Sequence, residues 1–190
     1  AVNAGDLSSG PAISPDGKTL YFFKVNDEKN LRQTRDIWMS KYNDKDSTWG
    51  TAVHMDPPIN NYDNNSVHSV TDSGRVLILH NRYLKNLTGK NGVSWSRIQE
   101  DKTWSFPKKV SIKNYKNVHD CSFNLSENGK VMIMAIKGKD SRGKLDLYVA
   151  HRIGDDNDDF KFGEPINLGP VINTPKGEAT ALLLEVNKTL

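Results

Sequence analysis

Several features that mark common protein classes are scarce in this chain of 190 residues. It has one cysteine, Cys121, so an internal disulfide is excluded. No run of apolar residues is long enough to cross a bilayer as a helix, and no window keeps a helical period over three turns. The 26 Lys and Arg residues nearly balance the 23 Asp and Glu residues. Because the basic residues are scattered rather than gathered into a stripe with aromatic residues, the sequence does not favour nucleic-acid binding.

A turn sequence recurs along the chain at a nearly constant interval. Its three copies are Ser14–Phe22, Thr71–Ile78 and Ser126–Ile133. Their turn glycines stand 57 and 55 residues apart, and a last trace, Val186–Leu190, follows at a similar interval. A fixed period of this length is typical of arrays of similar supersecondary units. The sequence therefore predicts three repeats and the start of a fourth.

A second landmark keeps the same interval. The segment Asp36–Ser40 matches Val93–Ser96 and Asp146–Ala150, and each copy holds one aromatic residue. These aromatic residues are Trp38, Trp95 and Tyr148. We expect them to be buried between sheets, because a single repeat can bury its apolar faces only against its neighbours.

Each repeat holds about four short runs rich in β-branched and aromatic residues, bounded by Gly, Pro, Asn and Asp. The runs lie at Gly10–Ile13, Thr19–Lys24, Asp36–Lys41 and Trp49–His54 in the first repeat, and at Cys121–Leu125, Lys130–Lys137, Leu145–Arg152 and Phe162–Pro165 in the third. The Asp-Gly, Ser-Gly and Asn-Gly pairs between the first two runs supply the positive φ angles of a tight hairpin. The pattern predicts an all-β fold, a β-propeller of four-stranded antiparallel blades. We expect a single domain over 1–190, with repeats at about 7–63, 64–118 and 119–176 and the start of the next at 177–190.

These motifs resemble the WD40-like, TolB-type β-propeller repeat of bacterial cell-envelope proteins, some of which are joined to OmpA-like peptidoglycan-binding domains. The best matches are Ser14–Phe22, Asp36–Ser40 and Pro165–Ala179. The middle repeat departs from the pattern, because Ser73 stands where an Asp is expected and Gly92–Trp95 replaces the Asp-Ile-Trp phrase. The resemblance implies a propeller fold and a periplasmic, outer-membrane-associated or secreted protein. It implies no single activity, since propellers include binding modules as well as enzymes.

The number of repeats falls short of the four to eight blades that a closed propeller typically has. Either the chain is part of a longer propeller, or two chains close one ring as a homodimer. The chain starts at Ala1 without an initiator methionine or a signal-peptide pattern. Such a start is expected of a mature exported protein or of a trimmed chain.

A polar residue recurs nine positions before each turn glycine or its equivalent, Asn187. The four residues at this position are Ser8, Asn65, Asp120 and Glu178. In a propeller this position lies at the start of the innermost strand, near one mouth of the central channel, where ligands commonly gather. The alternative is a structural hydrogen bond to a neighbouring blade. His68 and His119, in the same strands, are the next ligand-binding candidates.

The segment Gly138–Lys144 fits seven positions of a phosphate-binding loop. However, Leu145 replaces the Ser or Thr that such a loop requires, and no helix is expected after it. We therefore interpret the segment as a hairpin loop.

Metal and cofactor signals are equally weak. An acidic run is a candidate for adventitious Ca²⁺ binding, but it lacks the ligand spacing and the closing Glu of a calcium loop and fits a solvated turn better. Its members are Asp155, Asp156, Asp158 and Asp159. The five histidines show no metal-ligand spacing, and Cys121 is expected to be a small packed residue. The sequence therefore predicts no cofactor, no structural metal and no catalytic residue.

The sequence favours a non-catalytic binding or scaffold module of a bacterial cell-envelope or exported protein, with a protein or glycan partner. The strong repeat and the lack of a catalytic constellation support this hypothesis. One alternative is a carbohydrate-active propeller enzyme that uses Asp120 and Glu178 at the channel mouth. Two carboxyl groups about 5 to 10 Å apart in one cleft would favour it. Another alternative is a self-assembling structural component.

Overall fold

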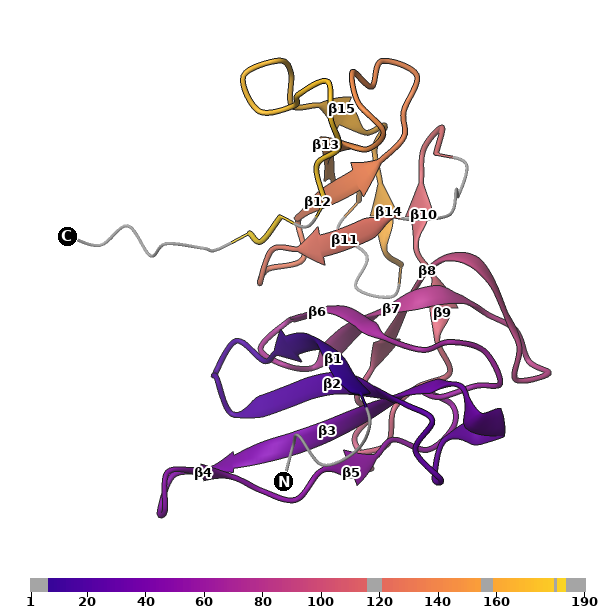
Figure 1. Ribbon diagram of the computed structural model, residues 1–190, viewed down its shortest axis with the longest axis vertical. Coiled ribbons are helices and arrows are strands. Elements are labelled where there is room, and N and C mark those ends of the chain that lie inside the picture. Colours follow the sequence, from indigo (N-terminus) through magenta and orange to yellow (C-terminus); the bar gives the residue numbers. More distant parts are fainter. Residues whose placement is uncertain (1–6, 116–120, 155–158, 180, 184–190) are drawn as a thin grey trace. The chain divides into compact units, whose positions relative to one another are not determined.

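The computed structural model describes residues 7–115, 121–154, 159–179 and 181–183. The chain divides into two compact units, Ala1–Lys109 and Val110–Leu190. Strands form nearly all of the regular structure (Figure 1), and the one helix in the described residues is a 3-10 turn at Leu31–Gln33. The all-β class is therefore confirmed. The single domain over 1–190 and the repeat boundaries within it stay predictions.

The first sheet is antiparallel and follows the chain in simple order. Its strands are β1 (Leu7–Ile13), β2 (Thr19–Val25), β3 (Arg35–Asn43) and β4 (Thr48–Trp49), and β5 (Val53–His54) also pairs with β3. The expected single outer strand over 49–54 is thus divided into two short strands. A bulge in β1 contains Gly10, whose φ is +63°. A Cβ atom on Gly10 would lie 2.6 Å from the Phe23 ring, so this close approach requires glycine.

The second sheet has the same organisation. Its strands are β6 (Val67–Thr71), β7 (Val76–Tyr83), β8 (Gly89–Arg97) and β9 (Lys108–Lys109), all antiparallel and in chain order. Strand β6 lies beside β1 (Figure 1), and the two sheets pack against each other around one apolar cluster. The cluster consists of Ala12, Tyr21, Ile37, Met55, Ile59, Val67, Val70, Leu77, Leu79 and Tyr83, each at most 9% exposed. Burying each of the larger apolar side chains contributes about 1.5–3 kcal/mol to folding.

The second unit contains a third sheet of four antiparallel strands. These are β11 (Ser122–Leu125), β12 (Val131–Ile136), β13 (Asp146–His151) and β15 (Ile166–Asn167), again in chain order. A separate parallel pair joins β10 (Ser111–Ile112) to β14 (Lys161–Phe162). The outer strand expected over 162–165 is therefore replaced by β14 and β15, of which only β15 joins the sheet. Beyond Lys176, the chain runs beside β11, where Ser122 Oγ donates a hydrogen bond to the Ala179 carbonyl at 3.1 Å.

The turn between the first two strands has the same hydrogen bonds in the first and third sheets. Ser14 Oγ accepts a bond from the backbone N–H five residues later at 2.8 Å, and Ser126 Oγ does so at 3.0 Å. Asp16 Oδ1 and Asn128 Oδ1 each accept one from the N–H two residues later, both at 2.9 Å. The turn of the middle sheet closes with the same spacing, from Thr71 to Val76, but there Asp72 and Ser73 have positive φ angles of 53° and 52°. The middle repeat therefore differs in structure where its sequence departs from the pattern.

The strand register corrects one match made from the sequence. Trp38 and Tyr148 each pair with the residue five positions after the turn glycine. Trp95 pairs with Ile78, four positions after its glycine, and Ser94 takes the place equivalent to Trp38. Because successive strand residues point to opposite faces, Trp95 lies on the other face of its sheet. All three aromatic side chains are nevertheless buried, as expected.

Candidate binding pocket and its supporting hydrogen bonds

A buried carboxylate anchors the start of β3. Asp36 is fully buried, and its Oδ2 atom accepts hydrogen bonds from the Leu31 N–H at 2.7 Å and from His54 Nε2 at 2.8 Å. The Asn60 side chain brackets the next residue, Ile37, accepting from its N–H at 2.8 Å and donating to its carbonyl at 2.9 Å. We call Asp36, His54 and Asn60 the polar clasp of the first sheet. It satisfies buried backbone groups that would each cost about 1–3 kcal/mol if left unpaired.

The second unit repeats this arrangement around Asp146, at the start of β13. Asp146 accepts hydrogen bonds from two backbone N–H groups of the preceding loop at 2.8 and 2.9 Å, and from Asn167 Nδ2 at 3.1 Å. Asn173 brackets Leu147 at 2.8 and 2.9 Å. Asp146, Asn167 and Asn173 form the polar clasp of the third sheet. Burial raises the pKa of Asp146, but the N–H groups and Asn167 outweigh that effect and hold it below its ordinary value.

Asn65, one of the four recurring polar residues, is fully buried beside the first clasp. Its backbone N–H donates to the Arg35 carbonyl at 2.6 Å. Its side chain donates to Asp36 Oδ1 at 3.3 Å and accepts from the Tyr83 hydroxyl at 3.1 Å. These bonds join the start of the second sheet to the first sheet. They support the alternative in which this position makes a structural hydrogen bond.

Glu178 holds the equivalent place in the second unit. Its backbone N–H donates to the Leu145 carbonyl at 2.9 Å, as that of Asn65 does to Arg35. Its Oε1 atom accepts from the N–H and the hydroxyl of Thr174 at 3.1 and 2.6 Å. The Glu178 carboxylate therefore stabilises the loop that runs from Thr174 to Glu178.

The two other described candidates lie in β1 and β6. Ser8 is half-buried and pairs with Lys24 across the sheet. His68 is half-buried and packs edge-on against His80, with ring centroids 5.5 Å apart. Burial and the nearby charges of His80 and Arg35 lower the pKa of His68 to about 3, so its imidazole is neutral near pH 7. Ligand binding at Ser8, Asn65, Glu178 and His68 stays a prediction.

Several residues named from the sequence lie outside the described residues. They are Asp120, His119, Asp155, Asp156 and Asp158. Asp159 is described, and it pairs with Lys161 at 2.7 Å. In the part of the chain that the structure describes, no three His, Cys, Asp or Glu side chains gather as a metal ion would require.

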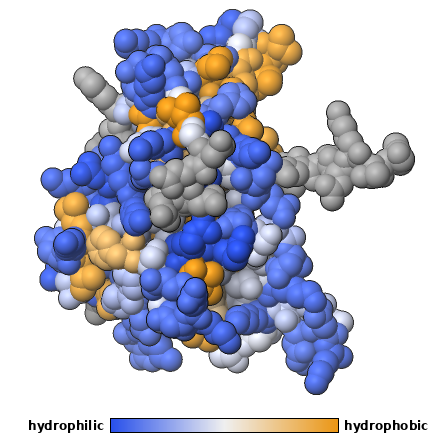
Figure 2. All heavy atoms as spheres, turned by 180° about the vertical axis from the view of Figure 1, so that it is seen from behind, coloured by the Kyte–Doolittle hydropathy of each residue, from blue (hydrophilic) through white to orange (hydrophobic). Residues whose placement is uncertain are grey.

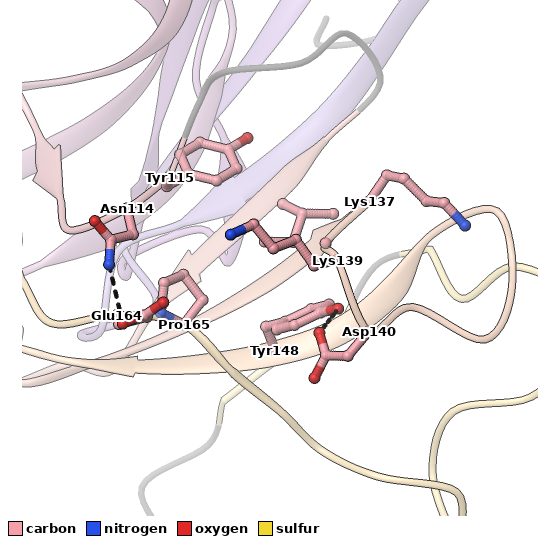
Figure 3. A pocket seen from close by; sticks show the side chains of 10 residues that line it. Asn114, Tyr115, Lys137, Lys139, Asp140, Tyr148, Glu164 and Pro165 are labelled. Atoms are coloured by element: carbon pink, nitrogen blue, oxygen red, sulfur yellow. Dashed lines mark hydrogen bonds between the residues drawn. The ribbon is translucent and has the colours of Figure 1, made fainter.

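A pocket of about 640 Å³ opens on the second unit (Figure 3). Its lining comes from segments that are distant in sequence. Asn114 and Tyr115 follow β10, Ile136–Asp140 leads out of β12, Tyr148 belongs to β13, and Glu164–Pro165 precedes β15. The pocket is thus built by one strand, the adjoining end of another and two loops.

The pocket gathers an ammonium, an amide and a carboxylate. Asn114 Nδ2 donates to Glu164 Oε2 at 3.1 Å. Figure 3 shows the Lys139 amine directed toward Asn114 and Tyr115, whereas Lys137 points away from the pocket. Lys137 instead donates to a loop carbonyl at 2.5 Å. Hydrogen-bond donors and acceptors are therefore available together at one side of the pocket.

Tyr148 fixes the opposite side. Its hydroxyl donates to Asp140 Oδ1 at 2.6 Å and lies 3.0 Å from Ser141 Oγ. Burial and the hydrogen bond to Asp140 raise the pKa of Tyr148, so the hydroxyl keeps its proton. A Cβ atom on Gly138 would lie 2.3 Å from this hydroxyl, and one on Gly143 would lie 1.6 Å from a backbone carbonyl oxygen. Close packing therefore leaves no room for a side chain at Gly138 or Gly143. The segment Gly138–Lys144, interpreted above as a hairpin loop, does join two strands, β12 and β13.

Sequence reasoning did not identify the pocket. Asn114, Tyr115 and Glu164 lie in connections between repeated strands, where the repeat pattern carries no information. Lys139 and Asp140 lie in the loop that was considered for phosphate binding. The one available signal was the density of basic residues in that loop.

Comparison with known proteins gives one distant likeness. No protein-family model matches the sequence, and no curated protein matches it either. Among solved structures, the chain is similar to a crystal structure of TolB from Acinetobacter baumannii, with 15% sequence identity and a TM-score of 0.43. The match covers 75% of this chain and 29% of the TolB chain, so this chain spans less than a third of that protein. The likeness is too distant to assign a family or a function. Among the described residues, no helix has the length and apolar character to cross a membrane.

Proposed function

We propose that this chain is a non-catalytic binding module and that the pocket of the second unit holds a glycan. The observation that carries the proposal is the grouping of Asn114, Lys139 and Glu164 beside the Tyr115 ring. Sugar hydroxyls need both donors and acceptors, and pockets supply them through a few polar groups set among flat apolar side chains. The Tyr115 ring is held edge-on against Phe123, with centroids 6.1 Å apart. A preorganised ring lowers the entropy that binding would otherwise lose.

We further propose that the three sheets are blades of a propeller in an exported protein of a bacterial cell envelope. The second and third sheets each have four antiparallel strands in chain order, and the first follows the same order with its outer strand divided into β4 and β5. The first two sheets pack against each other as successive blades do. From the sequence resemblance, we propose that the protein is periplasmic, outer-membrane-associated or secreted. The partner of this binding module is either a glycan or another protein of the cell envelope.

Saturation-transfer NMR with chitotriose, cellotriose and trigalacturonic acid as probes tests the glycan site. We expect transfer to at least one probe. We expect Asn114→Ala and Lys139→Ala to weaken its binding at least about tenfold, because a lost hydrogen bond to a charged group costs about 1.5–3 kcal/mol. Lys130→Ala, an exposed lysine in the β11–β12 turn, is the matched control and leaves binding unchanged. No transfer to any probe, or equal binding by Lys139→Ala, contradicts the proposal.

A carbohydrate-active enzyme is the second candidate function. The specific observation in its favour is that two carboxylates, Asp140 and Glu164, line one pocket. Both are held, by the Tyr148 hydroxyl and the Asn114 amide respectively. Release of reducing ends from the same three oligosaccharides, lost in Glu164→Gln and in Asp140→Asn, supports this function. Binding of an oligosaccharide without release of reducing ends would instead support the non-catalytic binding module.

A further inference from the structure

Arg35 is the first residue of β3, and its side chain lies on the face of the first sheet that packs against the second sheet. Ile37, two residues later on the same strand, points to the same face and belongs to the buried cluster between the two sheets. The Arg35 guanidinium lies over the Phe23 ring, with its Cζ atom 4.6 Å from the ring centroid. The half-buried Arg35 side chain is thus at one end of a face that the first unit itself covers.

The positive charge of Arg35 has no counter-charge in the described part of the chain. No Asp or Glu among the described residues forms an ion pair with it. Its Nε atom is buried, and no described residue accepts a hydrogen bond from that atom. Burial lowers the pKa of Arg35, but a guanidinium stays charged at pH 7. The Phe23 ring adds a weak attraction but no hydrogen-bond acceptor, so the charge is left uncompensated.

Two histidines lie beside Arg35. The Asn65 N–H donates to the Arg35 carbonyl at 2.6 Å, and the His80 N–H donates to the Ser66 carbonyl at 2.9 Å. Because Asn65 and Ser66 are consecutive, these bonds bring the start of β3 close to the second half of β7. The His68 ring packs edge-on against the His80 ring. Burial lowers the pKa of both imidazoles, and the nearby charge of Arg35 lowers it further.

The group is accessible and consists of hydrogen-bond donors. Arg35, His68 and His80 are each half-buried rather than enclosed. With its lowered pKa, the His80 imidazole is neutral at pH 7 and keeps one ring N–H as a donor. A guanidinium contributes five N–H groups in a planar fork. This combination suits a ligand that carries negative charge on two or more oxygen atoms.

We propose that Arg35 and His80 bind an oxyanion, a carboxylate or a phosphate group, where the first two sheets meet. A guanidinium donates two parallel hydrogen bonds to such a group, and its geometry fits both kinds of oxyanion. The His80 ring N–H adds a donor, and the packing of His68 against it holds the ring in place. The anion supplies the counter-charge that Arg35 lacks among the described residues. This site lies in the first unit and does not depend on the glycan pocket of the second unit.

NMR spectra of the histidine side chains in the whole chain test the proposal without any variant. The chain is titrated at pH 7 with sodium phosphate and, separately, with sodium succinate, while sodium chloride keeps the ionic strength constant. We expect a saturable shift of the His80 signals with at least one probe, half-complete below about 10 mM. A response to phosphate alone identifies a phosphate group as the ligand, and a response to succinate alone identifies a carboxylate. No saturable shift with either probe overturns the proposal.

Two arginine variants locate the site. Arg35→Gln removes the charge and the fork, so we expect the half-saturation concentration to rise at least about tenfold. Arg32→Gln is the matched control, because the exposed Arg32 lies in the same segment and also covers an aromatic ring, that of Tyr62 at 4.0 Å. It should bind the probe like the natural chain. Equal binding by Arg35→Gln and the natural chain overturns the proposal.

Urea unfolding separates a binding role of Arg35 from a structural one. All four tryptophans lie in the first unit, so their fluorescence reports on it. A bound anion stabilises the folded chain, whereas the general effect of phosphate as a salt acts on every variant. The probe that binds should therefore raise the unfolding midpoint more in the natural chain than in Arg35→Gln. A midpoint that falls in Arg35→Gln, together with equal responses of both chains to the probe, assigns Arg35 a structural role and overturns the proposal.

Discussion

His54 Nε2 lies 2.8 Å from Asp36 Oδ2, and this pair occupies the same place in its sheet as Asn167 and Asp146 in the third sheet. Trp38 pairs with His54, and Tyr148 pairs with Asn167. One clasp therefore contains a titratable group where its copy contains an amide. The two units should differ in how their stability responds to pH.

The hydrogen bond to Asp36 raises the pKa of His54 above 6.5, although burial opposes it. A raised folded-state pKa contributes stability that is fully present below the unfolded-state pKa, near 6.5, and lost as pH rises through the folded-state value. We expect the first unit to lose stability as pH increases above about 6.5. His54→Asn should remove this slope while keeping a hydrogen bond to Asp36, as Asn167 does to Asp146.

All four tryptophans lie in the first unit, so urea unfolding followed by tryptophan fluorescence reports on that unit. The unfolding free energies of the natural chain and of His54→Asn are compared between about pH 6.5 and 8.5. Burial lowers the pKa of His68 and of His80, and their effects appear as pH falls below 6.5. Parallel pH profiles for the natural chain and His54→Asn would contradict the assignment.

The bracketing asparagines give a second prediction. Asn60→Ala and Asn173→Ala leave the backbone N–H of Ile37 and of Leu147 without its partner, whereas each carbonyl still accepts a backbone hydrogen bond. Each variant should therefore destabilise its unit by about 1–3 kcal/mol. Fluorescence should detect the loss in Asn60→Ala, and far-UV circular dichroism should detect it in Asn173→Ala. Asn43→Ala, at the exposed end of β3, is the control, and because its two side-chain hydrogen bonds are open to water we expect a loss of at most about 0.5 kcal/mol. A loss below about 0.5 kcal/mol in both bracketing variants would show that water replaces these bonds.

The sequence carried enough information to predict the sheets, because both landmarks belong to the strands. Ser14 with Asp16, and Ser126 with Asn128, make the turns that the repeated pattern predicts. Trp95 was misplaced by one residue, because matching aromatic letters ignores strand register. A one-residue shift moves a side chain to the other face of the sheet. The sequence alone could not reveal that shift.

The candidate site was less accessible to sequence reasoning. Asn65 could be recognised as recurring, but its role depends on Asp36 and Tyr83, which are distant in the chain. Asn114 and Glu164 are 50 residues apart, and their contact follows from the parallel pairing of β10 with β14. That pairing has no counterpart in the repeat, so no periodic signal predicts it.

The loop beside the pocket gives a third prediction. Gly143→Ala would place its Cβ atom 1.6 Å from the Lys176 carbonyl oxygen. This contact involves backbone, so the loop must shift and we expect the stability of the second unit to fall by about 2–4 kcal/mol.

The Cβ atom of Gly138→Ala meets the Tyr148 hydroxyl instead, and Tyr148→Phe removes that hydroxyl. The double variant Gly138→Ala with Tyr148→Phe should therefore be less destabilised than the sum of the two single variants. Additive losses would contradict the proposed contact. Gly163→Ala, whose Cβ would lie at an ordinary 3.6 Å from the His151 carbonyl oxygen, controls for glycine replacement in the second unit.

The buried carboxylate of the second unit gives a fourth prediction. Hydrogen bonds from two loop N–H groups and Asn167 hold the pKa of Asp146 below 3.8 against the effect of burial. A depressed folded-state pKa contributes stability that is present above the unfolded-state pKa and lost as pH falls through the folded-state value. Asp146→Asn keeps the shape but turns one acceptor into a donor that faces N–H groups. We expect it to lower the stability of the second unit by about 1–3 kcal/mol at pH 7, with the difference from the natural chain shrinking below about pH 4. Urea unfolding followed by far-UV circular dichroism measures both values. A difference that stays constant down to pH 2.5 would mean that Asp146 acts through packing rather than through its charge.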